Sequence, residues 1–273
     1  MSDDVQTIRA NGIRFAYLSQ GSGPLVMLFH GFPDTAHTWD HVMPLIAAKG
    51  YRAIAFFMRG YDPTEVPPRD ADADTLARDP IALLDALGEK EAIIVGHDWG
   101  ATCAYGAASL APERVKKLFV VGIPHPAAVT PRPSLVWGVR HFLAYKLPGA
   151  GKRFVRNDFE ALPRIYKRWS PTWSPPASEL AALRACFANE ASREAAFGYY
   201  RKLDPRLRPF MRKPIHVPTI VFAGTDDPIV TPKDYHGARR MFASDYTVEV
   251  MPGGHFMHRE HPEIFAERLL AHL

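Results

Sequence analysis

Short apolar runs alternate along the chain with stretches in which apolar residues recur at helical spacing. The run Leu25–Phe29 is continuously apolar, which is typical of a strand buried on both faces. Asp79–Leu87 instead has apolar residues at helical spacing and ends before Gly88, a common residue at helix ends. The predicted strands are Ile13–Leu18, Pro24–His30, Tyr51–Phe57, Glu91–Val95, Lys117–Val121, Thr219–Phe222 and Tyr246–Val250. The predicted helices are Asp79–Leu87, Ala101–Leu110, one near Asp234–Phe242, and Pro262–Leu273.

The order of these elements predicts an α/β fold. Repeated strand–helix units favour a mostly parallel sheet with helices on both faces, joined by right-handed crossovers. The alternation stops between residues 127 and 213, which are rich in Pro, Trp and Arg and show only helical patches. We therefore predict a core formed by residues 1–126 and 214–273, interrupted by a mostly helical insertion at 127–213.

Composition indicates an ordinary soluble globular protein. The 273 residues are 47% hydrophobic and 23% charged. The acidic, polar start does not look like a signal peptide, and no apolar run approaches the ~18 residues of a membrane helix. Two cysteines, Cys103 and Cys186, give neither a disulfide framework nor metal-ligand spacing. We expect a cytoplasmic protein with reduced thiols and no membrane partner.

The net charge of +4 is unevenly distributed. Residues 127–213 hold 17 Lys and Arg against 6 Asp and Glu, whereas the rest of the chain holds 16 against 23. A basic segment is compatible with nucleic acid or an anionic substrate. Because no nucleic-acid motif accompanies the charge, we expect solvated basic helix faces and no nucleic-acid partner.

The strongest chemical motif is Gly96-His97-Asp98-Trp99-Gly100, which directly follows an apolar strand and directly precedes a helix. Small residues two positions before and after Asp98 permit a sharp, strained turn. Such a turn presents the central side chain at the carboxyl end of the sheet, where open α/β folds bind ligands. The central position of a nucleophile elbow usually holds Ser. In this chain Asp98 occupies that position, and Asp98 is therefore the predicted nucleophile.

A candidate base follows the last predicted strand. His255 lies after two glycines, on a loop expected at the same sheet edge as Asp98. His258 and His261 follow at three-residue spacing and could suggest a metal site. Pro262 interrupts a helix through them and no fourth ligand is evident, so we predict no metal.

Gly224-Thr225-Asp226-Asp227-Pro228 follows the strand Thr219–Phe222 and supplies an acid to orient the imidazole. Asp227 is preferred, and Asp226 stays an alternative; either could instead only build the turn.

His30-Gly31-Phe32-Pro33 ends a central strand and can turn the Phe32 amide toward the site. Together with the Trp99 amide it would form an oxyanion hole.

The order nucleophile, acid, histidine is that of the α/β-hydrolase fold. The chain resembles the epoxide hydrolase branch of that family, with its dehalogenase relatives, through these four motifs and through Arg59-Gly60-Tyr61. The resemblance covers the whole core. It implies an α/β-hydrolase fold in which residues 127–213 form a helical cap.

In that family two cap tyrosines hold the epoxide oxygen. Gly198-Tyr199-Tyr200-Arg201 resembles the motif of the second tyrosine, which assigns the role to Tyr200. Seven residues before Pro148, where the first tyrosine normally stands, this chain has His141. His141 is therefore either a second donor to the leaving oxygen or an exposed residue of a cap helix. With an unperturbed pKa of ~6.5 it would change charge near neutrality.

The departure at His141 also resembles fluoroacetate dehalogenases, which have a histidine there. Those enzymes place arginines after the nucleophile, where this chain has Trp99 and Thr102. Haloalkane dehalogenases share a tryptophan like Trp99 but often have Asn where this chain has Phe32.

The resemblance implies that Asp98 attacks a saturated carbon and forms an alkyl ester, which His255 then hydrolyses with water. Tyr200, helped by His141 or Tyr145, would protonate the leaving oxygen. We also expect Trp99, Tyr145 and His30 to contact the substrate.

Three functions follow from this reading. The leading one opens an epoxide to a vicinal diol, the second releases halide from a haloalkane or haloacid, and the third is non-catalytic binding of a small molecule. No cofactor is required, and the chain is expected to be a monomer or homodimer.

Overall fold

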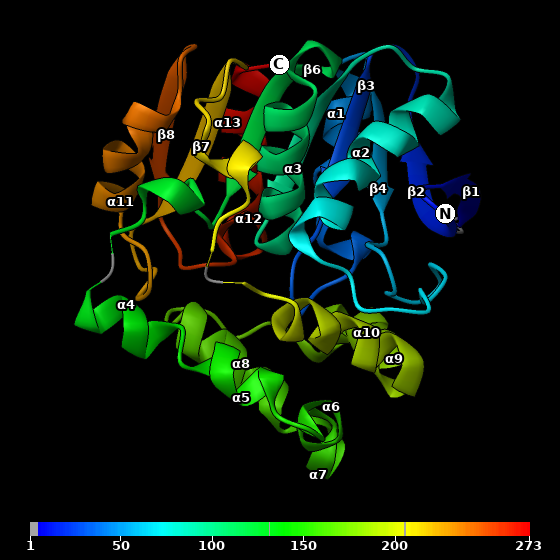
Figure 1. The fold of residues 1–273 in the computed structure, drawn as a ribbon, viewed down its shortest axis with the longest axis vertical. Coiled ribbons are helices and arrows are strands. Elements are labelled where there is room, and N and C mark those ends of the chain that lie inside the picture. Colours follow the sequence, from blue (N-terminus) through cyan, green and yellow to red (C-terminus); the bar gives the residue numbers. More distant parts are fainter. Residues whose placement is uncertain (1–4, 131, 205) are drawn as a thin grey trace.

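The structure is a computed structural model that describes residues 5–130, 132–204 and 206–273. Its centre is an eight-stranded sheet with strand order β1-β2-β4-β3-β5-β6-β7-β8 (Figure 1). Strand β2 pairs antiparallel with both β1 and β4, and all other pairs are parallel. The strands are β1 (Gln6–Ala10), β2 (Ile13–Gln20), β3 (Leu25–Phe29), β4 (Arg52–Phe56), β5 (Ala92–His97), β6 (Val115–Val121), β7 (Thr219–Gly224) and β8 (Tyr246–Met251).

Helices cover both faces of this sheet, and each face has its own apolar core. On one face α2 (Ala73–Leu87) and α3 (Trp99–Leu110) bury side chains such as Leu83 and Tyr105. On the other face α1 (Met43–Ala48) and α13 (Pro262–Ala271) bury Ile46 and Phe265. The further core helices are α11 (Pro232–Gly237), α12 (Met257–Glu260) and the 3-10 turns η1 (Ala36–Trp39), η2 (Pro112–Arg114), η3 (Pro126–Ala128) and η6 (Ala238–Met241).

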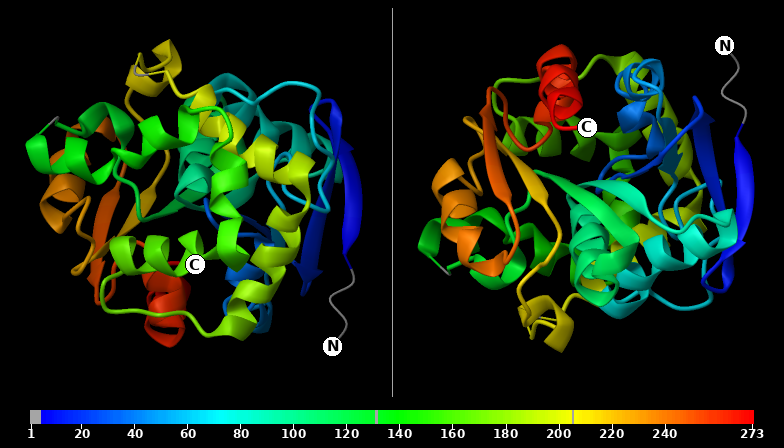
Figure 2. Two further views of the ribbon diagram at one scale, coloured as in Figure 1. Left: turned by 90° about the horizontal axis from the view of Figure 1, so that it is seen from below. Right: turned by 90° about the horizontal axis from the view of Figure 1, so that it is seen from above.

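Most of the helical chain between β6 and β7 crosses the carboxyl edge of the parallel strands (Figures 1 and 2), whereas η5 (Pro209–Arg212) packs against α3 on one face of the sheet. The described residues between β6 and β7 form helices and no named strand. A third apolar cluster joins these helices to the core through residues such as Phe32, Trp99 and Tyr200. The helices are α4 (Pro133–Gly138), α5 (His141–Lys146), α6 (Ala150–Phe154), α7 (Arg156–Phe159), α8 (Ala161–Trp169), η4 (Ala177–Leu180), α9 (Ala181–Ala188), α10 (Glu190–Arg201) and η5 (Pro209–Arg212). We refer to them as the cap; the domain boundaries at 126 and 213 stay a prediction.

The α/β-hydrolase architecture expected from the sequence is confirmed, and three local predictions fall short. The sequence pattern did not predict strand β1, because its mostly exposed residues carry little apolar signal. It also did not predict helix α1. Helix α2 begins at Ala73, where the Asp72 carboxylate accepts the Thr75 N–H at 2.9 Å, and it continues through Pro80. The capping signal at Asp72 marks the true start better than the apolar spacing does. Among the described residues, no helix combines the length and apolarity needed to cross a membrane.

Candidate active site

Asp98 occupies the turn between β5 and α3, with a φ of 52°. A φ in this region is strained for any residue other than glycine. The turn is tight: a Cβ at Gly100 would lie 2.2 Å from the Phe29 carbonyl oxygen, and a Cβ at Gly31 would lie 2.3 Å from the Cβ of the Asp98 side chain. The glycines of the sequence motif are therefore required by contact with neighbouring strands and loops.

The structure brings Asp98, His255 and Asp227 together at this edge. The Nε2 atom of His255 lies 3.4 Å from Oδ2 of Asp98, and its Nδ1 atom lies 3.5 Å from Oδ2 of Asp227. All three side chains are buried. The imidazole therefore lies between two carboxylates.

The two neighbouring acids of the β7 loop have different surroundings. Asp227 is buried, and its Oδ1 accepts the backbone N–H groups of Ile229 at 2.8 Å and Val230 at 3.1 Å. These bonds leave Oδ2 facing His255. Asp226 is exposed and accepts the Gly253 N–H at 3.1 Å, so it closes the turn. The geometry favours Asp227 over Asp226.

Burial disfavours the charged forms of Asp98 and His255, but the attraction between the imidazolium and the two carboxylates outweighs the effect of burial. Burial raises the pKa of Asp98, whereas His255 and the Phe32 N–H lower it, and the net pKa lies below the usual value. Burial lowers the pKa of His255, whereas Asp227 and Asp98 raise it to about 10. At neutral pH the free protein therefore holds an Asp98 carboxylate beside a His255 imidazolium.

One backbone amide contacts the Asp98 carboxyl group, and a second follows it in the chain. The Phe32 N–H donates to Oδ1 at 2.8 Å. Trp99 is the first residue of α3, so its N–H belongs to the helix-start donors that lack an acceptor inside the helix. The oxyanion hole expected from the two motifs stays a prediction.

His30, in contrast, is not positioned to contact a substrate, and this corrects the sequence-based expectation. Its Nδ1 donates to the Gly31 carbonyl at 2.9 Å, and its Nε2 accepts the Met58 N–H at 3.0 Å. The ring is fully buried and does not line the cavities at Asp98. Burial lowers the pKa of His30 to about 4, so the ring is neutral and supports the loop that carries Phe32.

Tyr200 lies on α10 and packs against residues of the site, although it lines neither cavity at Asp98. Its ring packs at centroid distances of 5.2 Å from Trp99 and 5.3 Å from Phe32. Burial and the Asp98 charge raise its pKa, and a hydrogen bond from the Trp99 side chain acts in the opposite direction. Because an indole N–H can only donate, the Tyr200 oxygen accepts this bond and keeps its own hydrogen available. Tyr199 instead donates to the Arg59 carbonyl at 2.7 Å.

His141 is buried, so the alternative of an exposed cap residue is wrong. Only 6% of it is exposed, and it lines a cavity of about 310 Å³ together with Asp98 and His255. Its Nδ1 lies 3.1 Å from the Gly138 carbonyl oxygen, so the proton of the neutral ring belongs on Nδ1. Burial lowers its pKa to about 4, so a charge change near neutrality is not expected. The neutral ring can therefore offer a ligand only an acceptor, the Nε2 atom.

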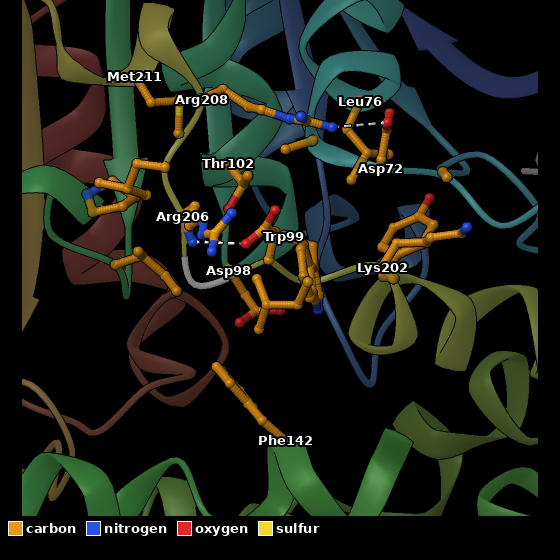
Figure 3. Close-up of a pocket in the computed structure, with 18 residues that line it drawn as sticks. Asp72, Leu76, Asp98, Trp99, Thr102, Phe142, Lys202, Arg206, Arg208 and Met211 are labelled. Atoms are coloured by element: carbon orange, nitrogen blue, oxygen red, sulfur yellow. Dashed lines mark hydrogen bonds and ion pairs between the residues drawn. The ribbon is translucent and has the colours of Figure 1, made fainter. Parts of the chain in front are cut away.

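The Tyr145 ring lies 4.9 Å from the Tyr200 ring, and Tyr145 lines a surface hollow of the cap. Neither tyrosine lines the cavities at Asp98, so substrate contact by Tyr145 stays a prediction. Trp99, the other predicted contact, does line a cavity of about 210 Å³ with Asp98 and Thr102 (Figure 3).

Sequence reasoning missed three contributors to the site. Phe142 lines both cavities at Asp98 and points toward that carboxylate from the cap (Figure 3). Trp169 accepts the His255 N–H through its carbonyl at 2.8 Å, and His97 contacts the His255 carbonyl through Nε2 at 3.0 Å. Phe142 and Trp169 gave no signal, because an aromatic residue at helical spacing looks like core. His97 lay inside the elbow motif and could have been considered.

His258, one of the two histidines that could suggest a metal, is bonded to another side chain. Nε2 of His258 lies 2.8 Å from the Thr38 hydroxyl, and the His258 side chain is buried. Within the part of the chain that is described, no three His, Cys, Asp or Glu residues form a group that could hold a metal ion.

Comparison with known proteins agrees with this geometry. Residues 24–262 match the family described as alpha/beta hydrolase fold. The chain is 30% identical over 281 residues to the AB hydrolase superfamily protein YfhM of Bacillus subtilis, covering 98% of this chain and 97% of that protein. It is 27% identical to epoxide hydrolase A of Mycobacterium tuberculosis, covering 97% and 96%.

Among solved structures, epoxide hydrolase A from Mycobacterium thermoresistibile superposes with a TM-score of 0.86 at 25% identity, covering 99% of this chain and 98% of that one. The strand order, the elbow and these relatives lead to one conclusion: the chain belongs to the α/β-hydrolase fold family, as an enzyme similar to the epoxide hydrolases.

Proposed function

We propose that the protein hydrolyses epoxides to vicinal diols through an ester formed on Asp98. The observation that carries this proposal is the His255 imidazole placed 3.4 Å from an elbow carboxylate and 3.5 Å from Asp227. A carboxylate attacking an acyl carbon gains little, because it produces an anhydride. Attack on a saturated ring carbon produces a stable ester that a second step can cleave.

In the first step Asp98 displaces the epoxide oxygen. Its lowered pKa keeps the nucleophile ionised at neutral pH. The developing alkoxide is a poor leaving group and takes a proton from Tyr200, whose oxygen is held by Trp99. His141 lines the cavity that contains Asp98 and His255, and with its proton on Nδ1 it acts there as an acceptor that orients the substrate.

Ester formation also prepares the base. The ester of Asp98 is neutral, so one of the two carboxylates that raise the pKa of His255 is lost. The pKa of His255 then falls and its proton is released. That proton balances the one that the alkoxide consumes, so the alkyl-enzyme holds a neutral imidazole and a neutral Tyr200.

In the second step neutral His255, oriented by Asp227, takes a proton from water as hydroxide adds to the ester carbonyl carbon. The Phe32 and Trp99 amides stabilise the oxyanion. Collapse breaks the ester bond and gives a diol that keeps one water proton, while the other proton remains on His255 beside the regenerated carboxylate.

The second candidate, a dehalogenase, rests on Trp99 and His141 as halide donors. The Trp99 indole bonds to Tyr200, and neutral His141 has no free N–H directed at the cavity. Phe32 offers no side-chain donor. A departing halide would therefore find fewer donors than a departing oxygen, which takes a proton from Tyr200.

The test compares styrene oxide with 1-chlorobutane and fluoroacetate, with diol and halide as the measured products. Diol formation without halide release supports the proposal, and halide release alone contradicts it. A single turnover in H₂¹⁸O then tests the ester: the label should enter Asp98 and not the first diol. Label in the first diol would mean that water attacks the epoxide directly.

A further inference from the structure

An apolar groove lies on the outer side of the cap. Val136 is 62% exposed, Trp137 68% and Leu143 72%, although side chains of this size are usually covered. Of the seven large apolar side chains that stand most exposed in the described chain, four lie within residues 136–147. Val136, Trp137 and Leu143 line a groove of about 1020 Å³ between α4, α5 and the segment after α10.

This groove adjoins the active-site cavities and shares several lining side chains with them. Phe142 lines the groove and also both cavities at Asp98. Leu203 and Leu207 are shared between the groove and the cavity beside Trp99, and Val139 is shared with the cavity beside His255. Figure 3 shows Phe142 extending from the cap toward Asp98. Only shared side chains such as Phe142 therefore stand between Asp98 and the groove.

The charged residues of the groove already have partners. Lys146 donates to the Leu203 carbonyl at 2.7 Å, and the Arg140 guanidinium lies 4.1 Å from the Trp137 ring centroid and donates to the Trp137 carbonyl. Arg132 pairs with Asp234. Asp204 accepts the Arg206 N–H at 2.8 Å. What the groove offers a ligand is therefore its apolar wall.

We infer that this groove holds the apolar chain of the substrate, so that the enzyme selects epoxides with an extended hydrocarbon substituent. The inference rests on the proposed function and adds the substrate class. The side chains that the groove shares with the cavities at Asp98 favour the substrate's own chain over another occupant. The substrate chain then contacts Val136, Trp137 and Leu143, none of which is catalytic. These contacts favour the binding of longer chains.

The experiment measures kcat/KM of the full-length enzyme for 1,2-epoxybutane, 1,2-epoxyhexane, 1,2-epoxyoctane and 1,2-epoxydecane. We expect kcat/KM to rise with length by up to about fourfold per methylene, which corresponds to about 0.8 kcal/mol for each buried CH₂. In the double variant Trp137→Ser/Leu143→Ser the ratio of kcat/KM for epoxydecane to that for epoxybutane should fall at least tenfold.

Leu147→Ser is the matched control. Leu147 is 57% exposed and follows α5 directly, but it does not line the groove. This variant should keep the wild-type ratio. A flat length dependence in the wild type, or an unchanged ratio in the double variant, overturns the inference.

Two other occupants give different results, and each also overturns it. If the double variant keeps the ratio but shifts a dimer to monomer in light scattering, the groove is an interface between copies. If it keeps the ratio but loses binding to phosphatidylglycerol vesicles, the groove is a lipid contact.

Failure of the proposed function is distinguishable from failure of this inference. If no epoxide is turned over, binding of 1,2-butanediol and 1,2-decanediol to Asp98→Asn by calorimetry still measures the groove. Tighter binding of the longer diol that disappears on adding Trp137→Ser/Leu143→Ser supports the groove, and equal binding of both diols overturns it.

Discussion

The two walls of the active site differ in kind. On the core side, Asp98, His255 and Asp227 are charged or polar groups held by backbone hydrogen bonds. On the cap side, His141, Phe142, Trp169 and Tyr200 form a wall of aromatic rings, in which His141 is neutral and bonded to the Gly138 carbonyl.

The difference indicates a division of labour. Polar groups on strand ends are fixed by the sheet, which gives the geometry that bond making requires. Aromatic rings on the cap helices line the cavities or pack beside them, and in the proposed mechanism one of them, Tyr200, donates a proton. Substitutions on the core side should therefore abolish a step, whereas those on the cap side should change rate or selectivity.

The largest effect is expected for Asp98→Asn. The amide is nearly isosteric but a far weaker nucleophile, so turnover should fall by at least about 10⁴-fold, the scale seen when a catalytic nucleophile is removed. Initial rates measure the loss, circular dichroism checks the fold, and mass spectrometry excludes deamidation. Activity near the wild-type level would mean that Asp98 is not the nucleophile.

His255→Gln should stop the reaction midway. Alkylation of Asp98 needs no general base, whereas ester hydrolysis does, so turnover should fall by about 10³-fold. The intact protein should gain the mass of one substrate molecule. His261→Gln, on the same loop region but outside the cavities, is the control and should turn over normally. A His255→Gln protein that never gains mass contradicts the two-step scheme.

On the cap side, Tyr200→Phe should lower the epoxide rate by about 10²-fold, because the proton donor is lost while the ring remains. Its neighbour gives a matched control. Tyr199→Phe loses the bond to the Arg59 carbonyl, so stability should fall by about 1 kcal/mol with little change in rate. Equal rate losses in both variants would mean that neither hydroxyl acts in chemistry.

The pH dependence should differ between the free enzyme and the ester. In the free enzyme the pKa of His255 is raised to about 10, so the imidazolium stabilises the fold below the unfolded value of ~6.5, and this contribution is lost as pH rises through about 10. In the alkyl-enzyme the Asp98 charge is absent. Decay of the ester, followed by quenching and mass spectrometry, should therefore rise with pH around a lower midpoint.

Asp227→Asn sharpens this test, because it removes the second carboxylate. The His255 pKa of the free enzyme, measured by NMR, should fall by about one unit or more. Asp226→Asn should leave it unchanged, since Asp226 faces the Gly253 amide. The same midpoint in free enzyme and ester would contradict the proposed release of the His255 proton.

The smallest effect is expected for His141→Tyr, which should keep or modestly raise epoxide turnover by adding a hydroxyl donor to the cavity. Because burial lowers the pKa of His141 to about 4, the wild-type profile should show no limb near pH 6.5 that disappears in this variant. A dehalogenase would instead lose halide release. Loss of epoxide turnover with halide release unchanged would contradict both readings of His141.

The sequence alone determined the α/β-hydrolase class, the elbow at Asp98 and the loops of Asp227 and His255. These features leave local signals: continuous apolar strands, glycines where backbones touch, and polar residues directly after strands. The exposed edge strand β1 escaped because it buries little, and its pairing with β2 is a contact between segments that local pattern does not record.

Only the tertiary structure decided the cap side. Three findings depend on which surfaces the helices bury: His30 supports a loop, Tyr145 packs against Tyr200, and Phe142 lines both the groove and the cavities. The protonation of His141 depends likewise on burial and on the Gly138 carbonyl. Burial and partner choice arise from contacts between segments distant in sequence, so residue type and spacing cannot determine them.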